Sequence, residues 1–111
     1  MAERLLTVAE VLERTNEERS IDKRDVRPSA LDAHIWQGMV SLPGCIPHAS
    51  HVARSRKEAL AFLRDYARDE EGRIPRAMSR TFRKGLSSGE GCYYGKQYAY
   101  ELVSMTVRGL F

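Results

Sequence analysis

The clearest element in the sequence is an amphipathic helix in the middle of the chain. Ser55 to Glu58 has the pattern of a capping box, in which the serine and glutamate side chains pair with backbone N–H groups at the helix start. Apolar side chains then recur at helical spacing, at Ala59, Leu60, Phe62, Leu63, Tyr66 and Ala67. Gly72 follows as a helix terminator. Because so long an apolar stripe must be covered, we expect this helix to pack across a sheet and supply much of the core.

The segments on either side of this helix favour β-strands. Residues 33–41 are rich in β-forming residues, and Leu42 to Cys45 suits a type II turn because proline is followed by glycine. A short antiparallel strand is expected at residues 51–53, and a further strand at residues 92–94. The strongest strand pattern covers residues 98–107, where Tyr, Val and Thr are frequent and no Gly or Pro interrupts.

Two further helices complete the predicted architecture. One covers residues 8–19 and begins with a second capping box, and one runs from Pro75 to about Lys84. Residues 20–32 are polar and are interpreted as a connector. The sequence therefore predicts an α+β fold, with a three- or four-stranded antiparallel sheet and two or three packed helices.

Length and composition limit the class of protein. The 111 residues suit one domain, residues 1–111, with a sheet-and-helix core over residues 33–111. No apolar run approaches the roughly 20 residues of a membrane helix, and the first residues lack a secretory pattern. We therefore expect no membrane partner and a cytoplasmic location, in the host cytoplasm if the gene acts in an infected cell. With no export signal, Cys45 and Cys92 are expected to be free thiols.

Basic residues are concentrated in the helical middle of the chain. Residues 53–84 carry ten basic and five acidic side chains, whereas residues 1–32 carry six and eight. Four cations at i, i+4, i+7 and i+8 share one face of the last predicted helix: they are Arg76, Arg80, Arg83 and Lys84. Arg64 and Arg68, one turn apart on the preceding helix, extend this set. We interpret the six residues as a partner-binding surface. The alternative is a solvent-facing stripe that Asp65 and Asp69 partly neutralise.

Tyrosines gather near the C-terminus and suggest a second kind of contact. Tyr98 and Tyr100 are two positions apart, so on a strand they face the same side. Stacking on nucleic-acid bases is one use of such a pair. The alternative is that the rings pack against the helices or form an interface.

Cysteine and histidine residues are the remaining candidates for chemistry. Cys45, His48 and His51 are closely spaced, and Cys92 would complete a set of four zinc ligands. A nucleophilic Cys–His pair is a second reading of the same residues. The spacing is not a common zinc pattern and no flanking signature supports a nucleophile. We therefore expect no catalytic residue, no bound metal and no cofactor, and we do not expect an enzyme.

Part of the chain resembles small accessory proteins encoded by bacteriophages. The shared outline is the strand at 33–41, a turn from Pro43 to Pro47, a short strand and a capped Ala-rich helix, together with the strand at 98–107. The resemblance implies a non-enzymatic binding protein that inhibits or modulates a host protein or ribonucleoprotein complex, as anti-CRISPR proteins do. The alternative function is a nucleic-acid-binding regulator that uses the same basic helix with tyrosine stacking. The sequence also leaves a homodimer open.

Overall fold

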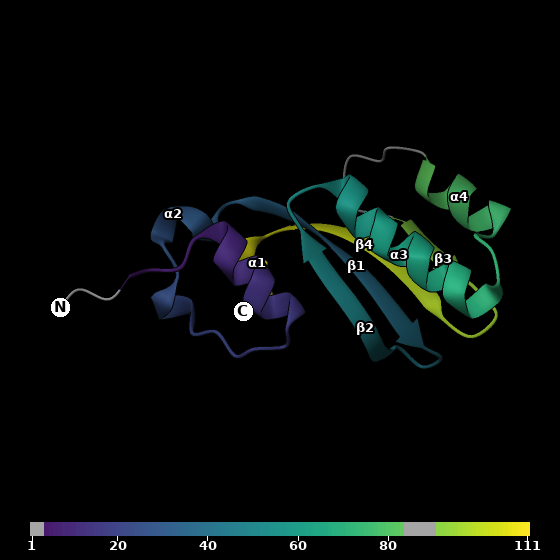
Figure 1. Ribbon diagram of the computed structural model, residues 1–111, viewed down its shortest axis with the longest axis horizontal. Helices are drawn as coiled ribbons and strands as arrows, with labels where there is room; N and C mark the ends of the chain where they lie inside the picture. The colour runs from purple at the N-terminus through teal and green to yellow at the C-terminus, as the bar shows by residue number, and fades with distance from the viewer. Residues whose placement is uncertain (1–3, 84–90) are drawn as a thin grey trace.

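The computed structural model describes residues 4–83 and 91–111 and confirms the predicted α+β fold class. Over these residues a four-stranded antiparallel sheet is combined with four α-helices (Figure 1). The elements are α1 (Val8–Asn16), the 3-10 turn η1 (Lys23–Asp25), α2 (Pro28–Leu31), β1 (His34–Leu42), β2 (Ile46–Ala53), α3 (Arg56–Glu71), α4 (Arg76–Arg83), β3 (Gly91–Tyr94), β4 (Ala99–Thr106) and the 3-10 turn η2 (Val107–Leu110).

The strands are arranged in the order β2-β1-β4-β3, so β2 and β3 form the two edges. The second strand is longer than the predicted residues 51–53, because pairing with β1 begins at Ile46. Pro47 is why the sequence predicts no strand at this position. Proline is nevertheless tolerated on an edge strand, because its missing N–H removes no hydrogen bond between strands. A register shift between Val40 and Ser41 also marks a β-bulge beside this proline.

The β1–β2 hairpin turns at Pro43, Gly44 and Cys45. Gly44 has φ 86°, the positive value that the predicted type II turn requires at this position. Cys45 also adopts a positive φ, 62°, which a non-glycine residue rarely does. The tip of the hairpin therefore holds two consecutive residues in the left-handed region.

Helix α3 packs closely against one face of the sheet. Ser55 accepts a hydrogen bond from the Glu58 backbone N–H and Gly72 ends the helix with φ 79°, as the sequence predicts, but the described residues show no reciprocal bond from the Ser55 N–H to the Glu58 side chain, which the predicted capping box includes. In β1, a Cβ added to Gly38 would lie 2.8 Å from the Ala59 carbonyl oxygen. The absence of a side chain at Gly38 therefore allows the close approach of α3 to the middle of β1.

Helix α4 lies beside the edge strand β3 (Figure 1). Its apolar side packs against that strand. Met78 and Phe82 are fully buried. The Phe82 ring lies so close to Gly91 that a Cβ on that glycine would meet it at 2.6 Å. The Arg56 guanidinium, at the start of α3, donates a hydrogen bond of 2.6 Å to the Phe82 carbonyl oxygen. These contacts fix the orientation of α4 on the rest of the molecule.

The N-terminal segment forms more structure than the predicted helix and connector. Helix α1 ends at Asn16 rather than Arg19, since Glu18 adopts a left-handed conformation with φ 58°. The connector at 20–32 contains η1 and α2, and buries Val26, Ala30 and Leu31. Its polar composition hid this contribution, because the few apolar residues that pack inward, Ile21 among them, are separated by polar ones.

Two hydrophobic clusters form on opposite faces of the sheet. Val52 belongs to the cluster of the N-terminal segment, whereas Ala53 belongs to the cluster under α3 and α4. Consecutive residues of a strand point to opposite faces, and Ile35 and Trp36 on β1 divide in the same way. The N-terminal segment therefore covers part of the sheet face that α3 does not cover.

Candidate functional site

The arginines that the sequence predicts as partner-binding residues lie on the outer side of α4. Arg76, Arg80 and Arg83 are exposed, while the opposite side of the helix is buried. Helical spacing explains this separation, because positions i, i+4 and i+7 share a face. Lys84, the fourth cation of the predicted set, lies outside the residues that the structure describes.

The charge of these three arginines is not compensated within the described part of the chain. The ion pairs found within 4.0 Å there involve Arg4, Arg19, Arg24, Arg68 and Arg108. Residues 72–83 contain four arginines and no acidic residue. The outer side of α4 is therefore a positive surface that is available to an acidic partner. We call Arg76, Arg80 and Arg83 the α4 arginines.

The two supporting arginines on α3 have different surroundings. Arg68 donates a hydrogen bond of 2.9 Å to the Asp65 carboxylate. This agrees with the alternative prediction, in which Asp65 partly neutralises a solvent-facing stripe. Arg64 is half-buried. Both residues therefore offer a partner less positive charge or less accessible surface than the α4 arginines do.

The predicted stacking pair is wrong for Tyr100. The two rings do lie on the same side of the sheet, 6.4 Å apart and edge to face. That side is covered by α3, so Tyr100 has no exposed surface. Tyr98 is half-buried and packs on His48 with ring centroids 4.9 Å apart. A base has no access to the Tyr100 ring, which belongs to the core.

Burial also changes the chemistry of the Tyr100 hydroxyl. Loss of solvation raises the pKa of Tyr100 to about 12, and the nearby carboxylates of Glu71 and Glu70 act in the same direction. Within the described residues the hydroxyl oxygen has no hydrogen-bond partner. The group is therefore neutral at physiological pH, and its role is in packing.

The cysteine and histidine residues do not converge on one centre. His51 stacks on Phe62 with ring centroids 5.4 Å apart, and His48 stacks on Tyr98. Both cysteines are exposed and free. Over residues 4–83 and 91–111, no three His, Cys, Asp or Glu side chains lie close enough together to hold a metal ion. The zinc reading of Cys45 and Cys92 with these histidines therefore has no geometric support.

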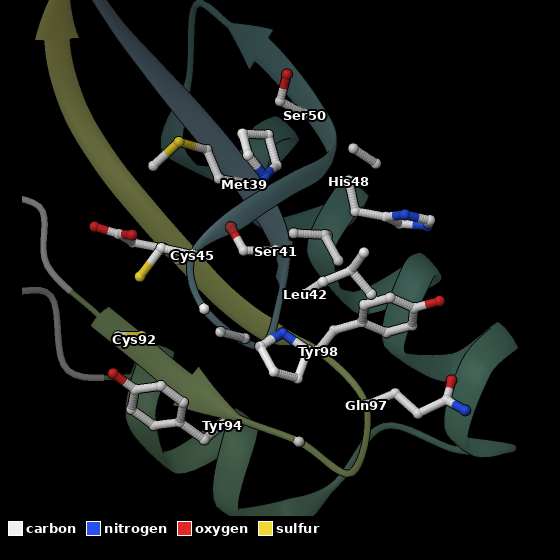
Figure 2. Close-up of a pocket in the computed structure, with 18 of the residues that line it drawn as sticks. Met39, Ser41, Leu42, Cys45, His48, Ser50, Cys92, Tyr94, Gln97 and Tyr98 are labelled. Carbon is white, nitrogen blue, oxygen red and sulfur yellow. The ribbon is translucent and has the colours of Figure 1, made fainter.

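A groove of about 810 Å³ lies around the hairpin end of the sheet and is lined by residues of both faces, and the sequence did not indicate it (Figure 2). Gln37, Met39 and Ser41 form part of its floor, and they alternate with the β1 residues that face α3. The hairpin tip and the β3–β4 turn form its rims. Both cysteines line this groove. The mixed polarity of Gln37, Met39 and Ser41 was the available signal, since a strand buried on both faces is more apolar.

Comparisons with protein-family models, with curated proteins and with solved structures gave no match to this chain. Among the described residues, no helix has the length and apolar character that crossing a membrane requires.

Proposed function

We propose that this protein is a non-enzymatic binding protein that recognises an acidic surface of a macromolecular partner through the α4 arginines. The observation that carries the proposal is the separation of the two sides of α4. Met78 and Phe82 fix one side in the core, and the α4 arginines project from the other without an acidic neighbour within ion-pair distance in the described residues. They span about 10 Å of helix, at 1.5 Å per residue.

Arginine suits recognition of carboxylates on a protein surface. Its planar guanidinium presents paired N–H donors that match a carboxylate, and it is a frequent hot-spot residue at interfaces. Because α4 is already packed on β3 and held by Arg56, little order must be gained when a partner binds. On the resemblance to phage accessory proteins, we propose that the partner is a host protein or ribonucleoprotein complex. The protein would inhibit or modulate this partner, as anti-CRISPR proteins do.

The test is affinity capture from nuclease-treated host lysate with a charge-reversed variant and a matched control. The variant is Arg76→Glu with Arg80→Glu. The control is Lys23→Glu with Arg27→Glu, which changes the net charge equally at exposed positions in the N-terminal segment. We expect a stoichiometric protein partner to be captured by wild type and control and to be absent with the α4 variant. Equal capture by all three proteins contradicts the proposal, provided that circular dichroism shows each variant folded.

Binding to nucleic acid through the same surface is the alternative function. The three arginines on one helix face favour it, whereas the burial of Tyr100 removes the stacking platform. Neutralisation of three phosphates predicts a slope of about −3 for log K against log salt, falling to about −1 in the Arg76 and Arg80 double variant. A partner that is lost on nuclease treatment and shows this salt slope favours the alternative over a protein partner.

A further inference from the structure

Two thiols that are far apart in the sequence lie in the same groove. Cys45 is at the tip of the β1–β2 hairpin, and Cys92 is on the edge strand β3. Both are exposed, and both line the groove at the hairpin end of the sheet. In Figure 2 the Cys45 side chain is directed from the hairpin tip towards the side of the groove on which Cys92 lies. The fold thus brings the cysteines of the chain to one surface.

The Tyr94 hydroxyl lies near both thiols. Tyr94 is 78% exposed and, being two residues after Cys92 on β3, shares its face of the sheet. A hydrogen bond with the Cys92 thiol raises the pKa of Tyr94, the charge of Cys92 adds to this, and Cys45 acts in the same direction. Both thiols are therefore close enough to one hydroxyl group to influence its ionisation.

The hairpin tip has space in which to adjust. A Cβ added to Gly44 would meet no atom within 4 Å, so the turn projects into solvent. The left-handed conformation of Cys45, φ 62°, is a strained one for a residue with a side chain. A disulfide requires Cα atoms about 4.4 to 6.8 Å apart with a suitable dihedral angle. An exposed turn reaches such a geometry more readily than two residues in a sheet interior.

We propose that Cys45 and Cys92 are a reversible redox pair, which low-molecular-weight disulfides such as glutathione disulfide convert to an intramolecular disulfide across the groove. The thiolate of one cysteine attacks glutathione disulfide, forms a mixed disulfide and releases one glutathione thiolate. The thiolate of the other cysteine then attacks the protein sulfur of the mixed disulfide and releases the second glutathione. The protein loses two electrons and two protons, and glutathione disulfide becomes two glutathione thiols.

The new bond joins the hairpin tip to β3 across the groove. Its formation in oxidising conditions is expected to restrict access to Met39, Tyr94 and Glu101, which line the same groove. None of the α4 arginines lines this groove. The redox pair is therefore independent of the proposed partner surface, and either proposal can fail alone.

The test equilibrates the folded protein with glutathione redox buffers, alkylates the remaining thiols and maps the tryptic peptides by mass spectrometry. We expect a species that has lost two hydrogen atoms and contains residues 25–54 linked to residues 85–96, the peptides that carry the cysteines. The effective concentration of one thiol towards the other is expected to be at least about tenfold higher in the folded protein than in guanidinium-unfolded protein. Excess dithiothreitol is expected to reverse the reaction completely.

The variants Cys45→Ser and Cys92→Ser serve as controls, since each retains one exposed thiol. Each is expected to accumulate only the mixed disulfide with glutathione under the conditions that oxidise wild type. Wild-type protein that takes up two glutathione molecules, forms only intermolecular dimers, or shows no folded-state advantage over the unfolded chain overturns the proposal.

Discussion

At the scale of single residues, Tyr100 shows that the two-residue period of a strand predicts which side chains share a face, but not which face is buried. The spacing of Tyr98 and Tyr100 correctly predicted that their rings share one side of the sheet. It did not specify which side α3 covers, because a period of two fits either face equally well. That choice depends on long-range packing, including the contact of Gly38 with α3. The outcome for Tyr100 is complete burial of the side chain.

The buried hydroxyl of Tyr100 predicts a loss of stability in alkaline solution. The pKa is about 12 in the folded protein and 10 in the unfolded chain, so above pH 10 the unfolded chain releases the proton first. The free energy of unfolding therefore falls between about pH 10 and 12, with a limit of about 2 to 3 kcal/mol from this group. The measurement is urea unfolding of wild type and Tyr100→Phe across this range.

The phenylalanine variant isolates the contribution of Tyr100 from that of other groups that titrate at high pH. At pH 7 it is expected to be as stable as wild type or up to about 1 kcal/mol more stable, because the hydroxyl has no partner in the described residues. The advantage of the variant is expected to grow with pH. A constant difference between the two proteins from pH 7 to 12 is incompatible with the raised pKa.

Gly38 gives a second prediction at this scale. Gly38→Ala places a methyl group 2.8 Å from the Ala59 carbonyl oxygen and 3.0 Å from a Leu63 side-chain carbon. Since backbone must move to relieve the first contact, we expect a loss of about 1 to 3 kcal/mol in the free energy of unfolding. Urea denaturation checks this, with Gly109→Ala as control because that site leaves at least 3.6 Å to its nearest neighbour. Equal stability of Gly38→Ala and wild type contradicts the packing of α3 on β1.

At the scale of secondary-structure elements, the sequence was most informative where the determining interactions are local. The caps Thr7 and Ser55, and the stop at Gly72, were predictable because each involves residues within one helical turn. The charged side of α4 was predictable for the same reason. The first half of β2 was not predictable from the sequence, because its strand conformation depends on pairing with β1. As an edge strand, β2 tolerates Pro47. The structure of residues 20–32 likewise depends on distant contacts.

Asn16 illustrates such a distant contact between elements. Its amide accepts a hydrogen bond of 2.7 Å from the Val52 N–H and donates one of 2.9 Å to the Val52 carbonyl oxygen, so it pairs with the outer edge of β2 as a neighbouring strand would. Asn16→Ala is expected to lower the free energy of unfolding by about 1 to 3 kcal/mol, because both backbone groups lose a partner.

Hydrogen exchange provides the direct measurement for Asn16. The protection of the Val52 amide is expected to fall in Asn16→Ala, while Glu13→Ala, at an exposed position of the same helix, leaves it unchanged. Unaltered protection of Val52 in Asn16→Ala is the result that excludes this edge contact.

At the scale of the whole molecule, the sheet connects two hydrophobic clusters along an extended body of 53 × 26 × 22 Å. Ile35 and Val40 place β1 in both clusters, and Val52 and Ala53 do the same for β2. Part of the groove follows from this arrangement, since the N-terminal segment covers only part of the face opposite α3. A sequence pattern does not specify where that coverage stops, which is why the groove was not predicted.

The shared strands predict that the two clusters unfold together. Neither cluster can lose β1 or β2 without exposing the apolar residues of the other, so one cooperative transition is expected. Hydrogen exchange of residues 8–16 and 56–71 in increasing urea is expected to give the same opening free energy for the most protected amides of each. Earlier unfolding of residues 8–16 with α3 still protected would show two independent units.

The central claim is that the α4 arginines form the partner surface, and the most direct measurement is the dissociation constant of the captured partner. It is measured for wild type, for Arg76→Glu with Arg80→Glu, and for the control Lys23→Glu with Arg27→Glu at one salt concentration. Loss of two hot-spot arginines predicts weakening of at least about 100-fold in the α4 variant, and less than about threefold in the control. Equal affinities for wild type and the folded α4 variant would contradict the claim.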